Sequence, residues 1–475
     1  MPQIVRVGVL APHKPGLDPR QALDFANIVI PQHLYESPYR PAADGDKVEP
    51  VLLEAPLQVD PAGPRNLSFW TTVRRDRKFS DGVPVTASAV ADSLSATPSF
   101  ANEAAVEAKG DRLYFRLRHA NARFDLTLAN LNLPVVKRGP GGYVATGPFI
   151  YAPDSRSDLV RLIRNPHYTG PVYPDEIQVH VYPPDADGRP TALIEAVKRR
   201  EVDFTDYLSR EQVNEVSGVQ KILVPGFCTS FLFFNTEKIT DARVRRALAY
   251  NVDRLALASA LFSNPVAFAA SSLLPPVLGR VRDRFAFSAE RAASLLKEVG
   301  FTPPIRPWTM LYPALPRPYL AQPQLVAEKL VERFAALKIQ VRLEPARDIA
   351  DFSRRAEGGN YDLALWGWIP DTPDRVDYLQ GLLSSAWIPR PGHSAAFSGN
   401  LARFKNPAMD GALATYRSER REDTLTEIHR MIEEEAPLLP LLYGTRIAVM
   451  SWRFTARPAS FEWRPFLAET PLKKD

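Results

Sequence analysis

The sequence predicts α/β or α+β lobes, and more than one of them. The chain has 475 residues, whereas a single hydrophobic core stops growing at roughly 250–300 residues. Helix-like and strand-like apolar periodicities mix along the whole chain, which argues against an all-α or an all-β fold. Hydrophobic residues make up 45% of the chain and charged residues 24%, a balance typical of folded globular domains rather than of disordered chains.

The first part of the chain opens on a strand and then mixes strands with short helices. Alternating segments predict strands at residues 4–10, 66–73 and 111–117. The apolar stretch 26–35 predicts a helix despite Pro31. Thr86 can accept a hydrogen bond from the first turn of a helix, so we expect it to cap a helix that carries Val90 and Leu94 on one face.

The clearest helix of the second part begins at or just before Asp241. Its apolar stripe has helical spacing and consists of Val244, Leu248, Val252, Leu255 and Leu261. Further helices are predicted at 288–299, 321–337 and 420–435, and strands at 339–343, 361–366 and 438–443.

Charge and side-chain chemistry argue against several classes of function. The 59 basic and 54 acidic residues leave a net charge of +5, and acids interrupt the basic runs, so we expect no nucleic-acid partner. The one cysteine, Cys228, lies in an apolar run, allows no intramolecular disulfide and is interpreted as an inert buried thiol. No pair of histidines has the spacing of a zinc-binding helix, and no Gly-x-Ser-x-Gly elbow is present. We therefore expect no metal site, no cofactor and no catalytic activity.

The N-terminus, Met1-Pro2-Gln3, leads straight into the first predicted strand. It has neither the basic nor the apolar region of a signal peptide, and the chain has no apolar run of about 18 residues that would span a bilayer. We expect neither an export signal nor a membrane span in the sequence as given.

Several short motifs follow one another along the chain. The first, Phe79–Ala87, reads Phe-Ser-Asp-Gly-Val-Pro-Val-Thr-Ala and combines an Asp-Gly turn with a helix start. The others are Thr146–Phe149 (Thr-Gly-Pro-Phe), Leu162–Tyr168 (with Arg-Asn-Pro), Glu201–Phe204, Phe234–Arg254 (with Phe-Asn-Thr and Arg-Val-Arg), Leu365–Trp368 with Asp371, and Glu435–Leu441. In this order they resemble the motifs of the family 5 extracellular solute-binding proteins, the peptide and nickel type that serves ABC importers. The resemblance runs from about residue 4 to residue 460, and Arg200 stands where the family has a glycine before Glu-Val-Asp.

The resemblance implies a two-lobed, periplasmic-binding-protein type II-like α/β fold with an extra subdomain inserted in lobe one. Lobe one would comprise residues 1–38, 143–233 and 440–475, the inserted subdomain residues 39–142, and lobe two residues 234–439. The ligand would lie between the lobes, and the lobes would close on it, since a ligand that prefers the closed state shifts the hinge equilibrium.

The resemblance also implies ligand-binding residues. In peptide-binding relatives an acid shortly after a Gly-Trp pair holds the α-ammonium group of the ligand, and Asp371 occupies that position; alternatively, Asp371 caps a helix. We expect Trp366 and Trp368 to point to opposite sides of a strand, with Trp368 facing the ligand and Trp366 in the core. Some relatives carry a basic residue just before the Gly-Trp pair. This chain has Leu365-Trp366 there, so the carboxylate of a free peptide has no obvious partner.

Tyr35, Phe231 and Asn235 lie beside the stretches that would connect the lobes. They line the ligand site in one interpretation and pack the core in the other.

The implied function is a monomeric ligand-binding clamp that passes its ligand to the permease of an ABC importer, its only link to a membrane. An oligopeptide or peptide-like solute is the expected ligand, but the matched motifs belong to the scaffold and do not choose among peptide, opine, oligosaccharide, metal chelate and antibiotic. The location would be periplasmic if this is a mature chain; without an export signal, a cytoplasmic location is the alternative. The alternative function is an intracellular ligand-sensing or partner-binding module that reuses the same fold.

Overall fold

The computed structural model describes residues 2–13, 18–20, 28–42, 47–139, 142–185, 188–262, 268–279, 285–370, 372–391, 399–456 and 466–473. The chain forms two compact units: unit 1 comprises Met1–Val224 and Ile447–Asp475, and unit 2 comprises Pro225–Arg446. The chain passes from unit 1 to unit 2 within strand β14 (Gln220–Phe234) and returns within strand β18 (Leu438–Met450). The sequence placed these changes after residue 233 and residue 439. Those boundaries, and the inserted subdomain, stay predictions.

Unit 1 is built around strand β1, in which Val5, Val7 and Val9 are buried. Its strands lie in the order β10-β11-β12-β1-β13, with β18 beyond β13; β1 runs parallel to β12 and β13. Further elements of unit 1 lie outside this sheet. The elements are β1 (Ile4–Val9), α1 (Pro31–Leu34), β2 (Tyr39–Pro41), β3 (Val48–Pro50), β4 (Gln58–Val59), β5 (Ser68–Thr72), α2 (Ala87–Ser95), α3 (Pro98–Glu103), β6 (Ala104–Lys109), β7 (Arg112–Leu117), α4 (Phe124–Leu128), β8 (Lys137–Gly139), β9 (Gly142–Val144), β10 (Phe149–Tyr151), β11 (Leu159–Arg164), β12 (Glu176–Val181), α5 (Thr191–Lys198), β13 (Phe204–Thr205), α6 (Arg210–Asn214) and the 3₁₀ helix η5 (Leu467–Glu469).

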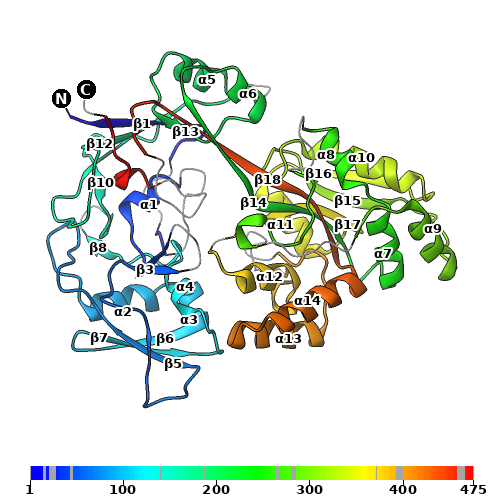
Figure 1. Ribbon diagram of the computed structural model, residues 1–475, viewed down its shortest axis with the longest axis horizontal. Helices are drawn as coiled ribbons and strands as arrows, with labels where there is room; N and C mark the ends of the chain where they lie inside the picture. The colour runs from blue at the N-terminus through cyan, green and yellow to red at the C-terminus, as the bar shows by residue number, and fades with distance from the viewer. Residues whose placement is uncertain are drawn as a thin grey trace. The chain divides into compact units, whose positions relative to one another are not determined.

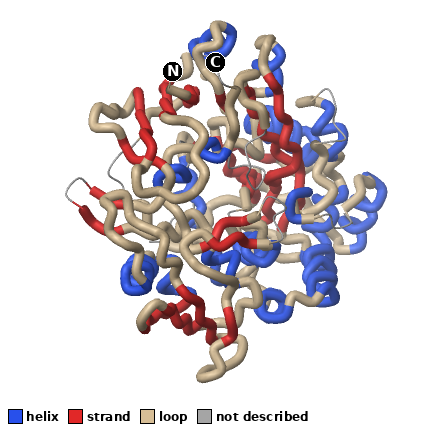
Figure 2. Tube along the Cα trace, turned by 60° about the vertical axis from the view of Figure 1, so that its left-hand side comes forward, coloured by secondary structure: helices blue, strands red, loops and turns tan. Residues whose placement is uncertain are grey.

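A second, smaller sheet of unit 1 has the antiparallel order β4-β5-β7-β6. Helices α2, α3 and α4 cover one of its faces (Figure 1), and Figure 2 shows the same strands at the lower end of the view with helices above them. Phe115 of β7 packs edge-on against Phe124 of α4, with ring centroids 5.4 Å apart. Thr86 caps α2 as expected, because its side chain accepts a hydrogen bond from the backbone N–H of Ala89.

Unit 2 is a sheet with helices on it, in the strand order β18-β14-β17-β15-β16. Strand β17 is antiparallel to β14, whereas β15 is parallel to both β16 and β17. Every residue of β15 is buried, as expected of a central strand covered on both faces. The elements are α7 (Ala242–Tyr250), α8 (Arg254–Ser259), η3 (Pro276–Leu278), α9 (Ala289–Glu298), β15 (Trp308–Pro313), α10 (Pro323–Ala335), β16 (Val341–Ala346), α11 (Ile349–Gly358), β17 (Leu363–Trp368), α12 (Arg375–Leu383), η4 (Ser385–Trp387), α13 (Pro407–Glu419) and α14 (Glu422–Glu435).

Two predicted helices differ from the structure. The single helix expected after Asp241 is two helices, because Asp253 caps α8 by accepting a hydrogen bond from the N–H of Ala256 and so starts a new helix. In the stretch 26–35 the structure has only the single turn α1 among the described residues, preceded by turns.

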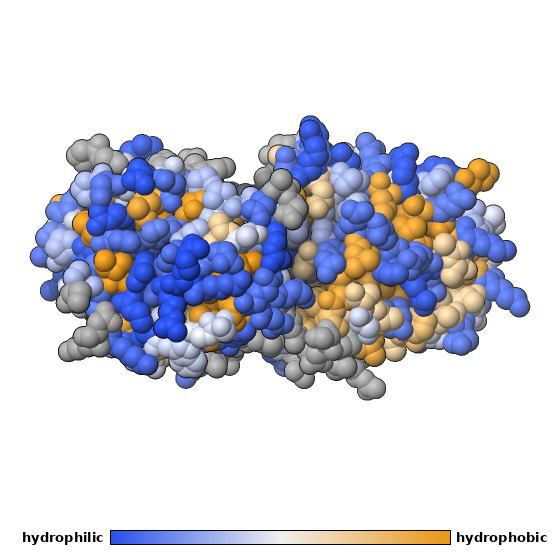
Figure 3. Space-filling model, turned by 90° about the horizontal axis from the view of Figure 1, so that it is seen from above, coloured by the Kyte–Doolittle hydropathy of each residue, from blue (hydrophilic) through white to orange (hydrophobic). Residues whose placement is uncertain are grey.

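The surfaces of both units carry hydrophilic side chains with apolar patches between them (Figure 3). The most exposed large apolar side chains of unit 2 are Leu255, Phe287, Ile305, Leu315 and Ile349. Within the described part of the chain, no helix has the length and apolar character that a membrane span requires.

Candidate ligand-binding site

Three parallel strands of unit 2 end at one edge of its sheet. Strand β15 ends at Pro313, β16 at Ala346 and β17 at Trp368, and all three run in the same direction. In open α/β sheets, ligands bind beyond the carboxyl ends of such strands. The residues that follow or end these strands are therefore the first candidates for a binding site in unit 2.

Trp366 and Trp368 of β17 lie on the same side of the sheet. Trp366 is opposite Phe231 of β14 and Trp368 is opposite Thr229, two positions along the same antiparallel register. Because side chains of a strand repeat every two residues, residues two apart share a face. The prediction that the two tryptophans point to opposite sides was wrong. The two rings have different neighbours, however: Trp366 contacts Phe352 and Tyr319, and Trp368 contacts Trp387.

Trp366 is partly exposed and lies among aromatic side chains. Its ring stacks on Phe352 of α11 with centroids 4.1 Å apart, and it meets Tyr319 at 5.7 Å. The guanidinium carbon of Arg317 lies 5.7 Å from the centroid of the same ring. This distance is within the range of a cation–π contact.

Arg317 has no described partner for its charge. Its Nε is buried and makes no hydrogen bond, and no ion pair joins the guanidinium to a carboxylate among the described residues. Its backbone is held in a tight hairpin, because the N–H of Arg317 donates to the carbonyl of Leu320 and the N–H of Leu320 donates back, each at 2.9 Å. The result is a fixed, partly exposed cation over an aromatic face at the carboxyl edge of the sheet.

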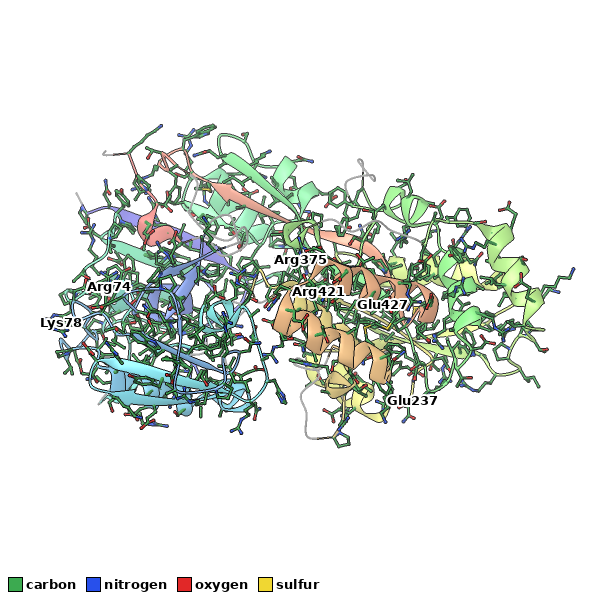
Figure 4. The ribbon with its side chains drawn as sticks, turned by 60° about the horizontal axis from the view of Figure 1, so that its bottom comes forward. Arg74, Lys78, Glu237, Arg375, Arg421 and Glu427 are labelled. Carbon is green, nitrogen blue, oxygen red and sulfur yellow. The ribbon has the colours of Figure 1, made fainter. Side chains whose placement is uncertain are left out.

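Several other surface arginines of unit 2 are paired with carboxylates. Arg375 meets Glu422 at 3.3 Å, Arg421 pairs with Asp423, and Arg430 with Glu427. Arg375, Arg421 and Glu427 come from helices α12 and α14 and their neighbouring turns (Figure 4). Arg317 differs from these three arginines because no carboxylate among the described residues pairs with it.

Arg317 was not predicted from the sequence. The cation expected to bind a carboxylate was the residue directly before the Gly-Trp pair, whereas Arg317 reaches Trp366 from a different loop. The available signal was the run Leu315-Pro316-Arg317-Pro318-Tyr319, in which two prolines restrict the backbone on both sides of a cation.

Trp368 lies in a second aromatic group beside α12. A Cβ built on Gly381 would lie 2.9 Å from the ring of Trp368. A Cβ built on Gly399 would lie 2.6 Å from the same ring and 2.6 Å from the carbonyl oxygen of Gly381. The ring also meets Trp387 edge-on, with centroids 6.5 Å apart. Its predicted contact with the ligand stays a prediction.

Asp371 lies outside the described residues, so its predicted role stays a prediction. The alternative role considered for it, the cap of a helix, belongs to another aspartate. Helix α12 is capped by Asp374, whose side chain accepts a hydrogen bond from the N–H of Val376. Arg420 holds the same carboxylate, with its Nη2 2.8 Å from Asp374 Oδ2.

The remaining predicted site residues are placed as follows. Phe231 is fully buried and meets Phe233 edge-on at 5.7 Å. Asn235 is also fully buried; its side-chain amide donates to the carbonyls of Gly359 and Tyr361.

Tyr35 lies in unit 1, directly after α1. Burial, with smaller contributions from the charges of Asp18 and Tyr143, raises the pKa of its phenol to about 12. Ligand contacts of Tyr35, Phe231 and Asn235 stay predictions.

Within the described residues, no group of three or more His, Cys, Asp or Glu side chains is arranged to hold a metal ion. The thiol of Cys228 is buried.

Comparison with known proteins places this architecture in a family. The sequence model of "Bacterial extracellular solute-binding proteins, family 5 Middle" matches residues 47–389. Among curated relatives, heme-binding protein A of Haemophilus influenzae is 26% identical over 65% of this chain and 56% of its own length. Probable di/tripeptide-binding protein 5 of Pseudomonas aeruginosa is 27% identical over 64% of this chain and 57% of its own length. The matched region thus spans little more than half the length of these relatives.

The fold extends beyond the matched region. A dipeptide-binding protein of Pseudoalteromonas sp. SM9913, solved in complex with Met-Leu, superposes with a TM-score of 0.80 at 20% identity over 99% of this chain and all of its own. This likeness confirms the predicted two-lobed fold class. Together with the family match over most of the sequence, it leads to one conclusion: the chain belongs to the bacterial extracellular solute-binding proteins, family 5.

Proposed function

We propose that this chain binds a small peptide-like solute with a free carboxylate and delivers it to the permease of an ABC importer. The observation that carries the proposal is Arg317, a fixed guanidinium over Trp366 without a described partner. Relatives named for di- and tripeptides, and a structural neighbour that holds Met-Leu, support a peptide as the ligand.

The chemistry of Arg317 suits a carboxylate. A guanidinium is planar, stays charged, and offers parallel N–H groups that match the two oxygens of a carboxylate. The cation–π contact with Trp366 holds the group in place before the ligand arrives, which lowers the entropy lost on binding. The fixed cation therefore selects solutes that carry an anionic end.

Asp371 is the proposed partner for the opposite end of the ligand. A carboxylate can pair with the α-ammonium group of a peptide, so Arg317 and Asp371 would recognise the two charges of a zwitterion. We expect Asp371→Ala to weaken binding of Met-Leu at least about tenfold, which corresponds to one lost charge contact of about 1.4 kcal/mol. Isothermal titration calorimetry measures this change, and circular dichroism checks that the variant is folded. An unchanged affinity would remove Asp371 from the site.

The proposal includes three further properties. The chain acts as a monomer, it works on the outer side of the cytoplasmic membrane, and it releases its ligand chemically unchanged. The family consists of solute-binding proteins, which supports the absence of catalysis. Size-exclusion chromatography with light scattering tests the first property. Mass spectrometry of a peptide incubated with the protein tests the last, since any product that disappears with an active-site substitution would show an enzyme.

The function is tested by comparing a peptide with its amide. Calorimetry on the purified chain should show binding of Met-Leu and at least about tenfold weaker binding of Met-Leu amide, because the amide removes the negative charge that Arg317 pairs with. Native mass spectrometry of freshly purified protein shows in parallel whether a ligand is retained. Equal binding of both compounds, or binding of haem with no binding of either, would contradict the proposed ligand class.

A further inference from the structure

Tyr319, two residues after Arg317, packs directly on a glycine of the sheet. A Cβ built on Gly367 of β17 would lie 2.2 Å from Cγ and Cδ2 of the Tyr319 ring and 2.8 Å from the carbonyl oxygen of Thr229. Real Cβ atoms do not approach other atoms this closely, because van der Waals repulsion is steep at such distances. Any side chain at position 367 would therefore lift the ring away from the strand.

A second glycine supports the same hairpin from strand β18, which β14 separates from β17 in the sheet. A Cβ on Gly444 of β18 would lie 2.5 Å from the carbonyl oxygen of Pro318, 2.9 Å from Cα of Tyr319 and 2.3 Å from Sγ of Cys228. Two of these atoms belong to the backbone of the hairpin, which cannot rotate out of the way as a flexible side chain can. The thiol of Cys228 on β14 fills the remaining space, so the one cysteine of the chain has a packing role here.

Neither glycine is explained by its backbone conformation. Gly367 and Gly444 are not among the glycines with positive φ. Glycine weakens a strand, since it costs conformational entropy and packs no side chain, so a strand glycine with ordinary dihedral angles points to a close approach by another segment. In this structure the approaching segment is the hairpin that carries Arg317.

We propose that Gly367 and Gly444 are positioning residues of the ligand site: they seat Tyr319 and the backbone of Pro318, and thereby hold the guanidinium of Arg317 over Trp366. The inference rests on the proposed function, in which Arg317 binds the carboxylate. The hairpin packs on the two glycines, and the reciprocal hydrogen bonds between Arg317 and Leu320 close it. The guanidinium of Arg317 consequently has a defined position beside the ring of Trp366.

Gly444→Ala tests the inference, and Gly411→Ala is its matched control. Gly411 lies in α13 of the same unit, and a Cβ built on it meets nothing within 4 Å. The first measurement is the rate at which phenylglyoxal modifies Arg317, followed by peptide mass spectrometry, with Arg291 of α9 as the internal reference. It needs no ligand. We expect faster modification of Arg317 in Gly444→Ala and no change in Gly411→Ala.

The second measurement is the ratio of affinities for Met-Leu and Met-Leu amide. A displaced guanidinium should reduce the preference for the free acid at least about tenfold in Gly444→Ala, whereas a general loss of structure would weaken both ligands alike. Because the added methyl group can prevent folding, Tyr319→Ala is measured as well. It removes the ring that sits on Gly367 without adding an atom, and it should raise the modification rate and reduce the preference in the same way.

The outcomes separate this inference from the proposed function. If folded Gly444→Ala and Tyr319→Ala keep the wild-type modification rate and the wild-type preference, the positioning role is wrong even where the proposed function holds. If the wild type itself shows no preference for the free acid, the proposed function is wrong, and the modification rates alone decide whether the glycines position Arg317.

Discussion

Each unit of this protein contains a charged side chain with a buried polar atom that makes no hydrogen bond. One example in unit 1 is Oε2 of Glu36, which directly follows Tyr35, and one in unit 2 is Nε of Arg317. Glu36 is only 8% exposed, whereas Arg317 is partly exposed at the edge of its sheet. The two groups thus pose the same electrostatic problem in different surroundings.

Glu36 and Arg317 differ in whether they can lose their charge. Burial raises the pKa of Glu36 to about 7, although Arg77, the hydroxyl groups of Thr146 and Tyr168, and Arg40 oppose the rise. Glu36 can therefore lose its charge near neutral pH by taking up a proton. An arginine cannot be deprotonated in a protein, so Arg317 keeps its charge, and water or an anion from outside the described residues compensates it.

The largest expected loss of stability comes from breaking a buried ion pair, that of Asp374 with Arg420. The carboxylate of Asp374 is 1% exposed and is held by Arg420. Removing one partner of a buried pair leaves a buried charge uncompensated, so Arg420→Met should lower the free energy of unfolding by about 3 kcal/mol. Urea denaturation followed by circular dichroism measures the change.

The neighbouring residue provides the control. Arg421 pairs with Asp423, but both side chains are 61% exposed, so Arg421→Met should change stability very little. The double variant Asp374→Asn with Arg420→Met should recover part of the loss. Equal effects of the Arg420 and Arg421 substitutions would show that the Asp374 pair is not buried in solution.

Arg317 should behave in the opposite way. Because its charge has no described partner, Arg317→Ala should leave stability nearly unchanged but weaken binding of Met-Leu about 100-fold, the effect of removing one member of a buried charge pair. The matched control is Arg291→Ala, since Arg291 also lies over an aromatic ring, 4.2 Å from the centroid of Tyr250. Calorimetry and urea denaturation on both variants separate binding from stability. A loss of stability without a loss of affinity would make Arg317 a structural residue.

Local signals made much of the fold predictable from the sequence. The cap at Thr86 and the start of a helix at or just before Asp241 were predicted because each polar residue and the apolar stripe that follows are close in sequence. The break at Asp253 was missed because the apolar stripe continues across it. The error at Trp366 and Trp368 came from a misapplied strand period, and the register with β14 corrects it.

The candidate site was less predictable because its contacts are distant in sequence. Arg317 and Trp366 come from different loops and strands, and no pattern within either segment indicates that they meet. The glycines that seat the hairpin carry no local signal, since Gly444 lies in a long strand with ordinary dihedral angles. Tertiary packing alone gives these residues their roles.

The smallest expected effect is the pH dependence that Glu36 adds to the stability of unit 1. Its pKa is about 7 in the folded chain, against an ordinary value of 4.5. Between these values the folded chain binds more protons at this site than the unfolded chain does, so the contribution of Glu36 to stability falls as pH rises from about 4.5 to about 7, by at most about 1.4 kcal/mol per pH unit. Glu36→Gln removes the titrating group and should flatten that slope.

The measurement is the difference in unfolding free energy between wild type and Glu36→Gln at pH 5, 6, 7 and 8. The difference isolates Glu36 from other groups, such as His33, whose pKa burial lowers to about 4 and whose contribution therefore rises with pH from about 4 to about 6.5. We expect the wild type to lose stability relative to Glu36→Gln as pH rises. A constant difference would mean that Glu36 keeps an ordinary pKa. In that case water or a cation would compensate the charge of Glu36, and Glu36 would stay charged at neutral pH as Arg317 does.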